Sequence, residues 1–159
     1  PETAVFRDTR LVTFLRRPTD QPPVLFYERL EPAVFVLRLV PGMRADIIPL
    51  LAPHYRALVL ESFGVGGLPG GEHGEMFAAL RRWCESGRLA VFTTQVPHEG
   101  CDLAVYEVGR AVGELPGVLE ARDMTPEAVA VKLMWALGQT EDREKAARLF
   151  ETPIEYDIM

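Results

Sequence analysis

From residue 33 onward, apolar runs rich in β-branched residues alternate with segments of helical spacing, and this alternation constrains the fold more than any other feature. The runs are typical of strands buried on both faces, and the segments between them of helices. We expect strands at 33–40, 57–63, 89–95 and 117–124, and helices at 43–55, 72–87, 103–115, 125–137 and 141–151. Strands separated by helices pair in parallel and are covered on both faces. The sequence therefore predicts an α/β fold: a three-layer, Rossmann-like domain with a four-stranded parallel sheet flanked by helices.

Residues 1–32 lack this alternation. Prolines at positions 18, 22 and 23 exclude a continuous helix there. We expect residues 1–32 to form an extended arm with one or two short strands, or an interdomain linker, and residues 33–159 to form the α/β domain. The first residue is Pro1 rather than a methionine, so we also expect the chain to be part of a longer polypeptide.

Charge and composition exclude several classes of protein. The formal net charge of -6 argues against nucleic-acid binding, because no basic surplus exists to displace counterions from phosphates. No apolar run approaches the roughly 20 residues that a membrane-spanning helix needs. The two cysteines, Cys84 and Cys101, do not make a disulfide framework and are typical of reduced thiols. We expect a cytoplasmic protein that contacts neither nucleic acid nor membrane.

The strand predicted at 57–63 runs into six glycines between Gly64 and Gly74. In parallel sheets, ligands bind beyond the carboxyl ends of the strands, where this loop lies. The loop has no lysine and hydroxyl pair of a P-loop, and Pro69 stands where a dinucleotide fingerprint requires its third glycine. We therefore expect no nucleotide cofactor. The glycines either let a ligand approach the backbone or only permit a tight turn.

The side chains that could do chemistry are scattered. His54, His73 and His98 fall on separate loops, and with Asp102 they match no metal-ligand spacing. We predict no metal site. Cys101 follows His98 on one loop, which leaves a thiol–imidazole pair open as an alternative.

Two further candidates lie at strand ends. Glu61 and Asp123 could act as acids or as partners of helix N-termini. Ser62 is not in the G-x-S-x-G context of a nucleophile elbow, and Cys84 falls on the apolar face of its helix. Nothing here supplies a complete catalytic set. Trp83 and Trp135 are core or interface residues, and periodicity does not distinguish the two.

Several motifs in order resemble one known family. They are "LESFGVGGLP" from Leu60, "VFTTQV" from Val91, "YEVG" from Tyr106 and "GVLEARDMTPEAVAVKL" from Gly117. Together they resemble the C-terminal domain of bacterial L-asparaginases, especially the intracellular type, and of related amidotransferase subunits. The resemblance covers about residues 33–150 and implies that 33–159 is an asparaginase C-terminal-like α/β domain.

The resemblance implies a division of labour. Asparaginases convert asparagine to aspartate and ammonia, with threonine nucleophiles, an aspartate and a lysine on a larger N-terminal domain. That domain carries T-G-G-T and T-D-T motifs, and neither occurs here. We therefore expect this chain to be inactive alone, to carry no catalytic residue, and to support dimerisation and the substrate cleft. The implied partners are its own N-terminal asparaginase domain, further copies in a dimer or tetramer, and a small amino-acid substrate.

The resemblance also assigns candidate site residues. The substrate-binding or interface loop would hold Ser62, Phe63, Gly64, Gly66 and Gly67, and the candidate rim residues are Thr94, Gln95, Tyr106 and Asp123.

The family pattern is not followed everywhere. Gly67 stands where the family has an asparagine, so that carboxamide contact cannot be made. Glu61 and Val96 replace an arginine and a cysteine that hold an asparagine effector in some intracellular members, so we expect that pocket to be absent or altered. Two alternatives remain: a sensor domain for a small amino acid, and the equivalent domain of a tRNA-dependent amidotransferase. The preference for asparagine or glutamine stays open.

Overall fold

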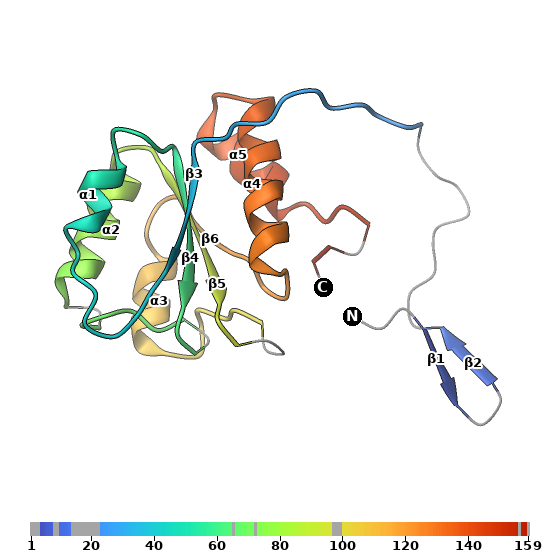
Figure 1. The fold of residues 1–159 in the computed structure, drawn as a ribbon, viewed down its shortest axis with the longest axis horizontal. Helices are drawn as coiled ribbons and strands as arrows, with labels where there is room; N and C mark the ends of the chain where they lie inside the picture. Colours follow the sequence, from blue (N-terminus) through green and yellow to red (C-terminus); the bar gives the residue numbers. More distant parts are fainter. Residues whose placement is uncertain are drawn as a thin grey trace.

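The fold has three layers (Figure 1). The computed structural model describes residues 4–7, 10–13, 23–64, 66–71, 73–96, 100–155 and 157–158. The central sheet has the order β3-β4-β5-β6, and its strands are all parallel. The strands are β3 (Val34–Arg38), β4 (Ala57–Ser62), β5 (Leu89–Thr94) and β6 (Val118–Glu120). The predicted α/β fold with a four-stranded parallel sheet flanked by helices is confirmed.

Helices cover both faces of this sheet. One face carries α1 (Ile47–Leu51), α2 (Glu75–Glu85) and α3 (Glu107–Gly113), and the other α4 (Pro126–Gln139) and α5 (Arg143–Glu151). Strand order follows chain order, so right-handed crossovers place the first three helices on the same face. None of the described helices is long and apolar enough to cross a membrane.

Strand β4 explains why the sheet strands read as unbroken apolar runs. Leu58 and Leu60 pack into the core beneath α1, α2 and α3, whereas Ala57 and Val59 pack into a second core beneath α4 and α5. All four side chains are fully buried. Burial of a leucine side chain contributes roughly 2 kcal/mol, so both faces favour apolar residues equally.

Several elements are shorter than the sequence predicts. The helix expected at 43–55 is the five-residue α1, whose extension is limited by Pro53. The strand expected at 117–124 ends at Glu120, because Arg122 turns the chain with a positive φ of 52°. The start of α4 is as predicted: the hydroxyl of Thr125 accepts a hydrogen bond from the backbone N–H of Ala128 at 3.3 Å.

The N-terminal segment is organised differently. Strands β1 (Ala4–Arg7) and β2 (Arg10–Thr13) pair antiparallel as a hairpin. Residues 23–33 have no regular secondary structure and lie along α4: the N–H of Glu31 donates to the carbonyl of Met134 at 2.9 Å, and the Tyr27 ring stands edge-on to Trp135. The domain boundary at residue 32 stays a prediction.

Candidate functional site

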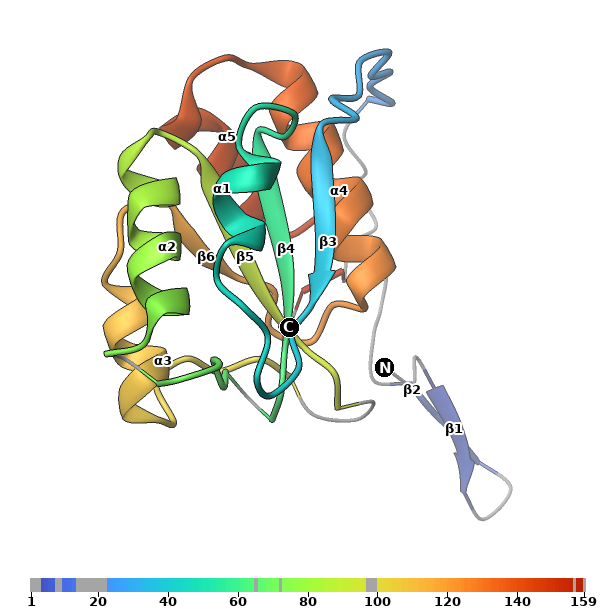
Figure 2. The ribbon, with the colours of Figure 1, turned by 60° about the vertical axis from the view of Figure 1, so that its left-hand side comes forward.

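The loops that follow β4 and β5 lie together at the carboxyl edge of the sheet, as Figure 2 shows. Two hydroxyl groups at this edge bond to the backbone, whereas that of Thr93 is fully buried without a hydrogen-bond partner among the described residues. Fully buried Ser62 donates from Oγ to the carbonyl of Thr93 at 2.8 Å. Thr94 donates from Oγ1 to the carbonyl of Gly64 at 2.5 Å and accepts from the N–H of Val96 at 3.0 Å. These bonds tie β4, β5 and the glycine loop together, and they leave neither hydroxyl positioned as a nucleophile.

Gln95 connects the ends of three strands through hydrogen bonds. Its Nε2 donates to the carbonyls of Leu39 and Glu61 at 2.6 and 2.8 Å, and its backbone N–H donates to the carbonyl of Ser62 at 3.0 Å. Its Oε1 accepts from Arg38 Nε at 3.2 Å. The T-Q motif therefore holds the ends of β3, β4 and β5 in register at the edge where a ligand would lie.

Glycines 64 and 67 shape the loop after β4 in two ways. Gly64 has a φ of +60°, which side-chain-bearing residues rarely adopt. The N–H of Gly67 donates to the carbonyl of Phe63 at 2.9 Å, closing a tight turn. A Cβ on Gly67 would lie 2.5 Å from the Phe63 ring and 2.6 Å from its carbonyl oxygen. The asparagine of the family pattern therefore does not fit here.

The expected site residues divide between two hollows at this edge. The loop hollow, of about 590 Å³, lies between the glycine loop and the start of α3 and is lined by Phe63, Gly64, Gly67, Gly71, Tyr106, Glu107 and Val108. The rim hollow, of about 380 Å³, lies at the start of α4 and is lined by Arg38, Glu61, Thr94, Gln95, Val96, Asp123, Met124, Thr125, Pro126 and Glu127. Ser62 and Gly66 are buried and line neither.

Arg38 lines the rim hollow, although the sequence pattern did not single it out as a site residue. Its Nε lies 3.8 Å from Glu61 Oε2, and its side chain is 63% exposed against 17% for Glu61. The sequence signal that could have identified Arg38 is a single basic residue at the carboxyl end of an apolar strand. With the carboxylates of Glu61, Asp123 and Glu127 around it, the hollow offers both signs of charge, which can complement the ammonium and carboxylate of an amino acid.

Thiol chemistry is not supported. Cys84 and Cys101 are both buried and form no disulfide with each other. Burial raises the pKa of the Cys84 thiol to about 11 and that of Cys101 to about 12, so both are protonated at neutral pH. His98 lies outside the described residues, and so does the alternative thiol–imidazole pair.

The described part of the chain provides no set of metal ligands. There, no three His, Cys, Asp or Glu side chains gather closely enough to hold a metal ion. His54 and His73 are exposed on separate loops. The described carboxyl edge thus provides shape, backbone groups and a few charges, and it belongs to a fold of a defined class: a three-layer α/β domain with a parallel sheet.

Comparisons with known proteins agree with this class. The profile of the Glutaminase/Asparaginase C-terminal domain matches residues 33–150. The L-asparaginase of Thermococcus kodakarensis is 39% identical over 134 residues, which are 84% of this chain and 40% of that protein. A component of the glutamyl-tRNA(Gln) amidotransferase of Metallosphaera sedula is 36% identical over 125 residues, 78% of this chain and 27% of that protein.

A solved structure extends the comparison to three dimensions. The thermostable L-asparaginase from Thermococcus kodakarensis superposes with a TM-score of 0.85 and 34% identity, over 100% of this chain and 48% of that chain. The chain belongs to the Glutaminase/Asparaginase C-terminal domain family, as its motifs led us to expect. It spans less than half the length of these relatives.

Proposed function

We propose that this chain is the C-terminal domain of an L-asparaginase-type amidohydrolase, which hydrolyses asparagine to aspartate and ammonia. Its role is to support dimerisation and to form part of the substrate cleft. Its partners are its own N-terminal asparaginase domain and further copies in a dimer or tetramer. Family membership and the fraction of the relatives that it spans support this division.

The observation that carries the proposal is that the hydroxyls at the ends of β4 and β5 either bond to the backbone or, for Thr93, are fully buried. The hydroxyls of Ser62 and Thr94 donate to carbonyl oxygens, and both thiols are buried and protonated at neutral pH. The described edge can therefore position and enclose a substrate, whereas an activated nucleophile has to come from elsewhere. We infer that the isolated chain is inactive.

We propose that the loop hollow faces the substrate. Its wall consists of backbone groups from Gly64 and Gly67 together with the side chains of Phe63 and Tyr106. Tyr106 is 52% exposed and can reach across a contact between protomers. In the rim hollow, Thr94 and Gln95 hold the edge in shape, and Asp123 is a candidate polar contact.

Ammonia release tests this function. We expect no release from asparagine or glutamine with the 159-residue chain, and release with a polypeptide that also carries a T-G-G-T domain ahead of Pro1. Robust activity of the chain alone contradicts the proposal. In the active polypeptide, Tyr106→Ala should raise KM for asparagine about tenfold, a loss of about 1.4 kcal/mol in binding. The matched control is Tyr27→Ala, a tyrosine of similar exposure (54%) on the arm.

A second candidate function is the equivalent domain of a tRNA-dependent amidotransferase. The 36% identity to the amidotransferase component from Metallosphaera sedula favours it. The net charge of -6 argues against RNA contact by this chain, so we propose that other parts of such a complex bind the tRNA. Glutamine-dependent amidation of glutamyl-tRNA by the assembled complex would support this function, whereas asparagine hydrolysis without tRNA would support the first.

A sensor domain is the third candidate, and the mixed charges of the rim hollow favour it. Calorimetry with asparagine, aspartate and glutamine separates it from the others, because micromolar binding by the isolated chain is expected only of a sensor. We also propose a cytoplasmic location. Two buried cysteines that are not joined by a disulfide support that location.

A further inference from the structure

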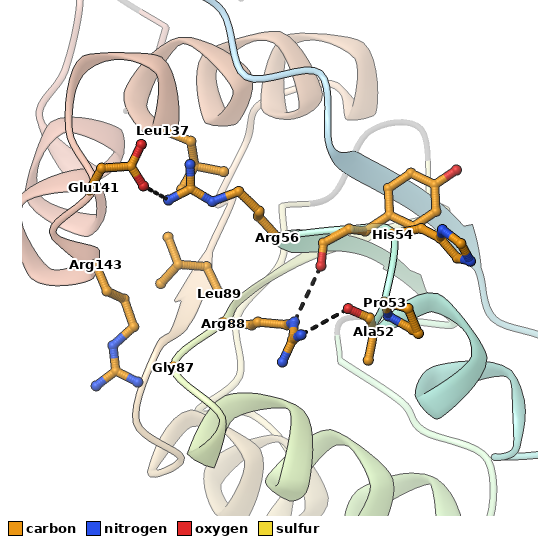
Figure 3. Close-up of a pocket in the computed structure, with 11 residues that line it drawn as sticks. Ala52, Pro53, His54, Arg56, Gly87, Arg88, Leu89, Leu137, Glu141 and Arg143 are labelled. Carbon is orange, nitrogen blue, oxygen red and sulfur yellow. Dashed lines mark hydrogen bonds and ion pairs between the residues drawn. The ribbon is translucent and has the colours of Figure 1, made fainter.

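A third cavity lies at the opposite, amino edge of the sheet. This amino-edge cavity, of about 340 Å³, is lined by Ala52, Pro53, His54, Tyr55, Arg56, Gly87, Arg88, Leu89, Leu137, Glu141 and Arg143. Arg56 directly precedes β4, Arg88 directly precedes β5, and Arg143 begins α5. Figure 3 shows these three side chains coming from different elements, with Leu89 between Arg143 and the other two and Leu137 beside Arg56.

Two of the three guanidinium groups keep their charge unneutralised. Arg56 is paired with Glu31 at 3.0 Å and with Glu141 at 2.7 Å. Neither Arg88 nor Arg143 has a carboxylate within ion-pair distance among the described residues. The cavity is therefore positive even after both glutamates are counted, on a chain whose formal net charge is -6.

Backbone carbonyls hold the two unpaired guanidinium groups in place. Arg88 donates from Nη2 to the carbonyl of Ala52 at 2.8 Å and from Nε to that of Tyr55 at 3.3 Å (Figure 3). Arg143 donates from Nη1 to the carbonyl of Cys84 at 3.1 Å, near the end of α2. Fixed groups lose little conformational entropy when a ligand binds, so these charges are preorganised.

Capping of helix ends uses only some of the N–H donors of these three arginines. Basic side chains do stabilise the carbonyl ends of helices such as α1 and α2. A guanidinium carries five N–H donors. On the described residues Arg88 uses three of them, Arg56 two and Arg143 one, so Arg143 and Arg56 keep most of their donors for a ligand.

We propose that the amino-edge cavity binds a tetrahedral oxyanion of the phosphate class. Guanidinium forks match pairs of phosphate oxygens, and a phosphate offers enough oxygens to be contacted from several directions, unlike a planar carboxylate. The volume admits a phosphate group with a small organic substituent. The site is separate from the two hollows at the carboxyl edge, so it does not depend on the proposed amidohydrolase function.

Calorimetry with inorganic phosphate at constant ionic strength tests the proposal. We expect saturable binding to the isolated chain, with sodium chloride giving none. Glycerol 3-phosphate in a second titration distinguishes a phosphate ester from the free ion as the better ligand. Arg143→Gln removes charge-assisted hydrogen bonds and should weaken phosphate binding at least about tenfold. Arg148→Gln is the matched control, with the same charge change on α5 at an exposed site outside the cavity.

A gain of affinity provides the decisive variant, because misfolding cannot produce it. Glu141 pairs with Nη2 of Arg56 and is itself 89% exposed, so Glu141→Gln should remove a negative charge from the cavity and tighten phosphate binding several-fold. Glu144→Gln makes the same charge change on α5 beside Arg148 and should have little effect. The proposal is overturned if phosphate shows no saturation by tens of millimolar, or if each cavity variant behaves like its control.

Discussion

Removing the side-chain amide of Gln95 should loosen the carboxyl edge measurably. Its Nε2 is the donor to the carbonyls of Leu39 and Glu61, at 2.6 and 2.8 Å, on two neighbouring strand ends. Each hydrogen bond contributes about 1 kcal/mol net, and leaving a partly buried acceptor without a donor costs about as much or more. We therefore expect Gln95→Ala to lower the free energy of unfolding by about 2 kcal/mol. The corresponding fall in Tm is about 4–8 °C.

Gln139 provides a matched control. Its Nε2 also donates to two carbonyl oxygens, those of Arg29 and Trp135, both at 2.9 Å, but at the more exposed end of α4. Water can replace those bonds, so Gln139→Ala should cost less than about 1 kcal/mol. Equilibrium urea unfolding of both variants measures the difference. A cost for Gln95→Ala below about 0.5 kcal/mol, or equal to that of the control, would refute the assignment.

Gln95→Glu adds a test in which the direction of the stability change with pH is predicted. One oxygen of the introduced carboxylate would face two carbonyl oxygens without a donor, which outweighs the exposed Arg38 beside the other oxygen, so the folded state raises its pKa above the value of about 4.3 in the unfolded chain. A raised pKa means that the protonated form is the one tolerated. The variant should lie closest to wild type below about pH 4 and lose stability as the pH rises through its folded pKa. Unfolding measured at about pH 4 and pH 7 checks this, and a pH-independent deficit contradicts it.

Variants at three further places test other parts of the structure. Lys132 is almost fully buried and paired with Asp157 at 2.7 Å, so Asp157→Ala should cost about 3 kcal/mol in urea unfolding, and Lys132→Met less, because it leaves no buried charge unpaired. A backbone N–H bond, reinforced by a guanidinium, lowers the pKa of Glu31, so its stabilisation is present above about pH 4.5 and lost as the pH falls below it. Glu31→Gln should therefore differ from wild type by about 1 kcal/mol at about pH 7, and by less at about pH 3.5, when unfolding is measured at both. Gly67→Asn should speed hydrogen exchange in the glycine loop, and adding Phe63→Ala should restore protection only in part, because the backbone carbonyl also blocks the Cβ.

The parallel sheet was predictable because the apolar pattern that buries its strands on both faces can be read directly from the sequence. Residues 57–60 are apolar without alternation, and each of the two faces of that strand has its own core. Element ends were less predictable, since the positive φ of Arg122 that ends β6 depends on how the chain turns into α4. Trp83 and Trp135 illustrate the same limit. Both lie on helix faces, but only Trp83 belongs to the core, where its Nε1 donates to the carbonyl of Leu89.

The candidate site could be located from the sequence but not resolved into roles. The motifs placed Ser62 and Thr94 at the carboxyl edge, yet their hydrogen-bond acceptors lie 31 and 30 residues away in the chain. A sequence pattern records neighbours along the chain, not which carbonyl a hydroxyl meets across a sheet. The amino-edge cavity was missed for the same reason, because Arg56, Arg88 and Arg143 come together only after β4, β5 and α5 have packed.

The two edges of the sheet differ in how far their polar side chains are already hydrogen-bonded within the fold. At the carboxyl edge, Thr94 and Gln95 are committed to the backbone, so substitutions there should change stability first and ligand binding only through the shape of the edge. At the amino edge, Arg143 retains most of its donors among the described residues, so its substitution should change anion binding with little loss of stability. Effects that separate in this way would assign Thr94 and Gln95 to the shape of the carboxyl edge and Arg143 to anion binding at the amino edge. Nearly equal losses of stability and binding at both edges would show instead that the arginines serve the fold alone.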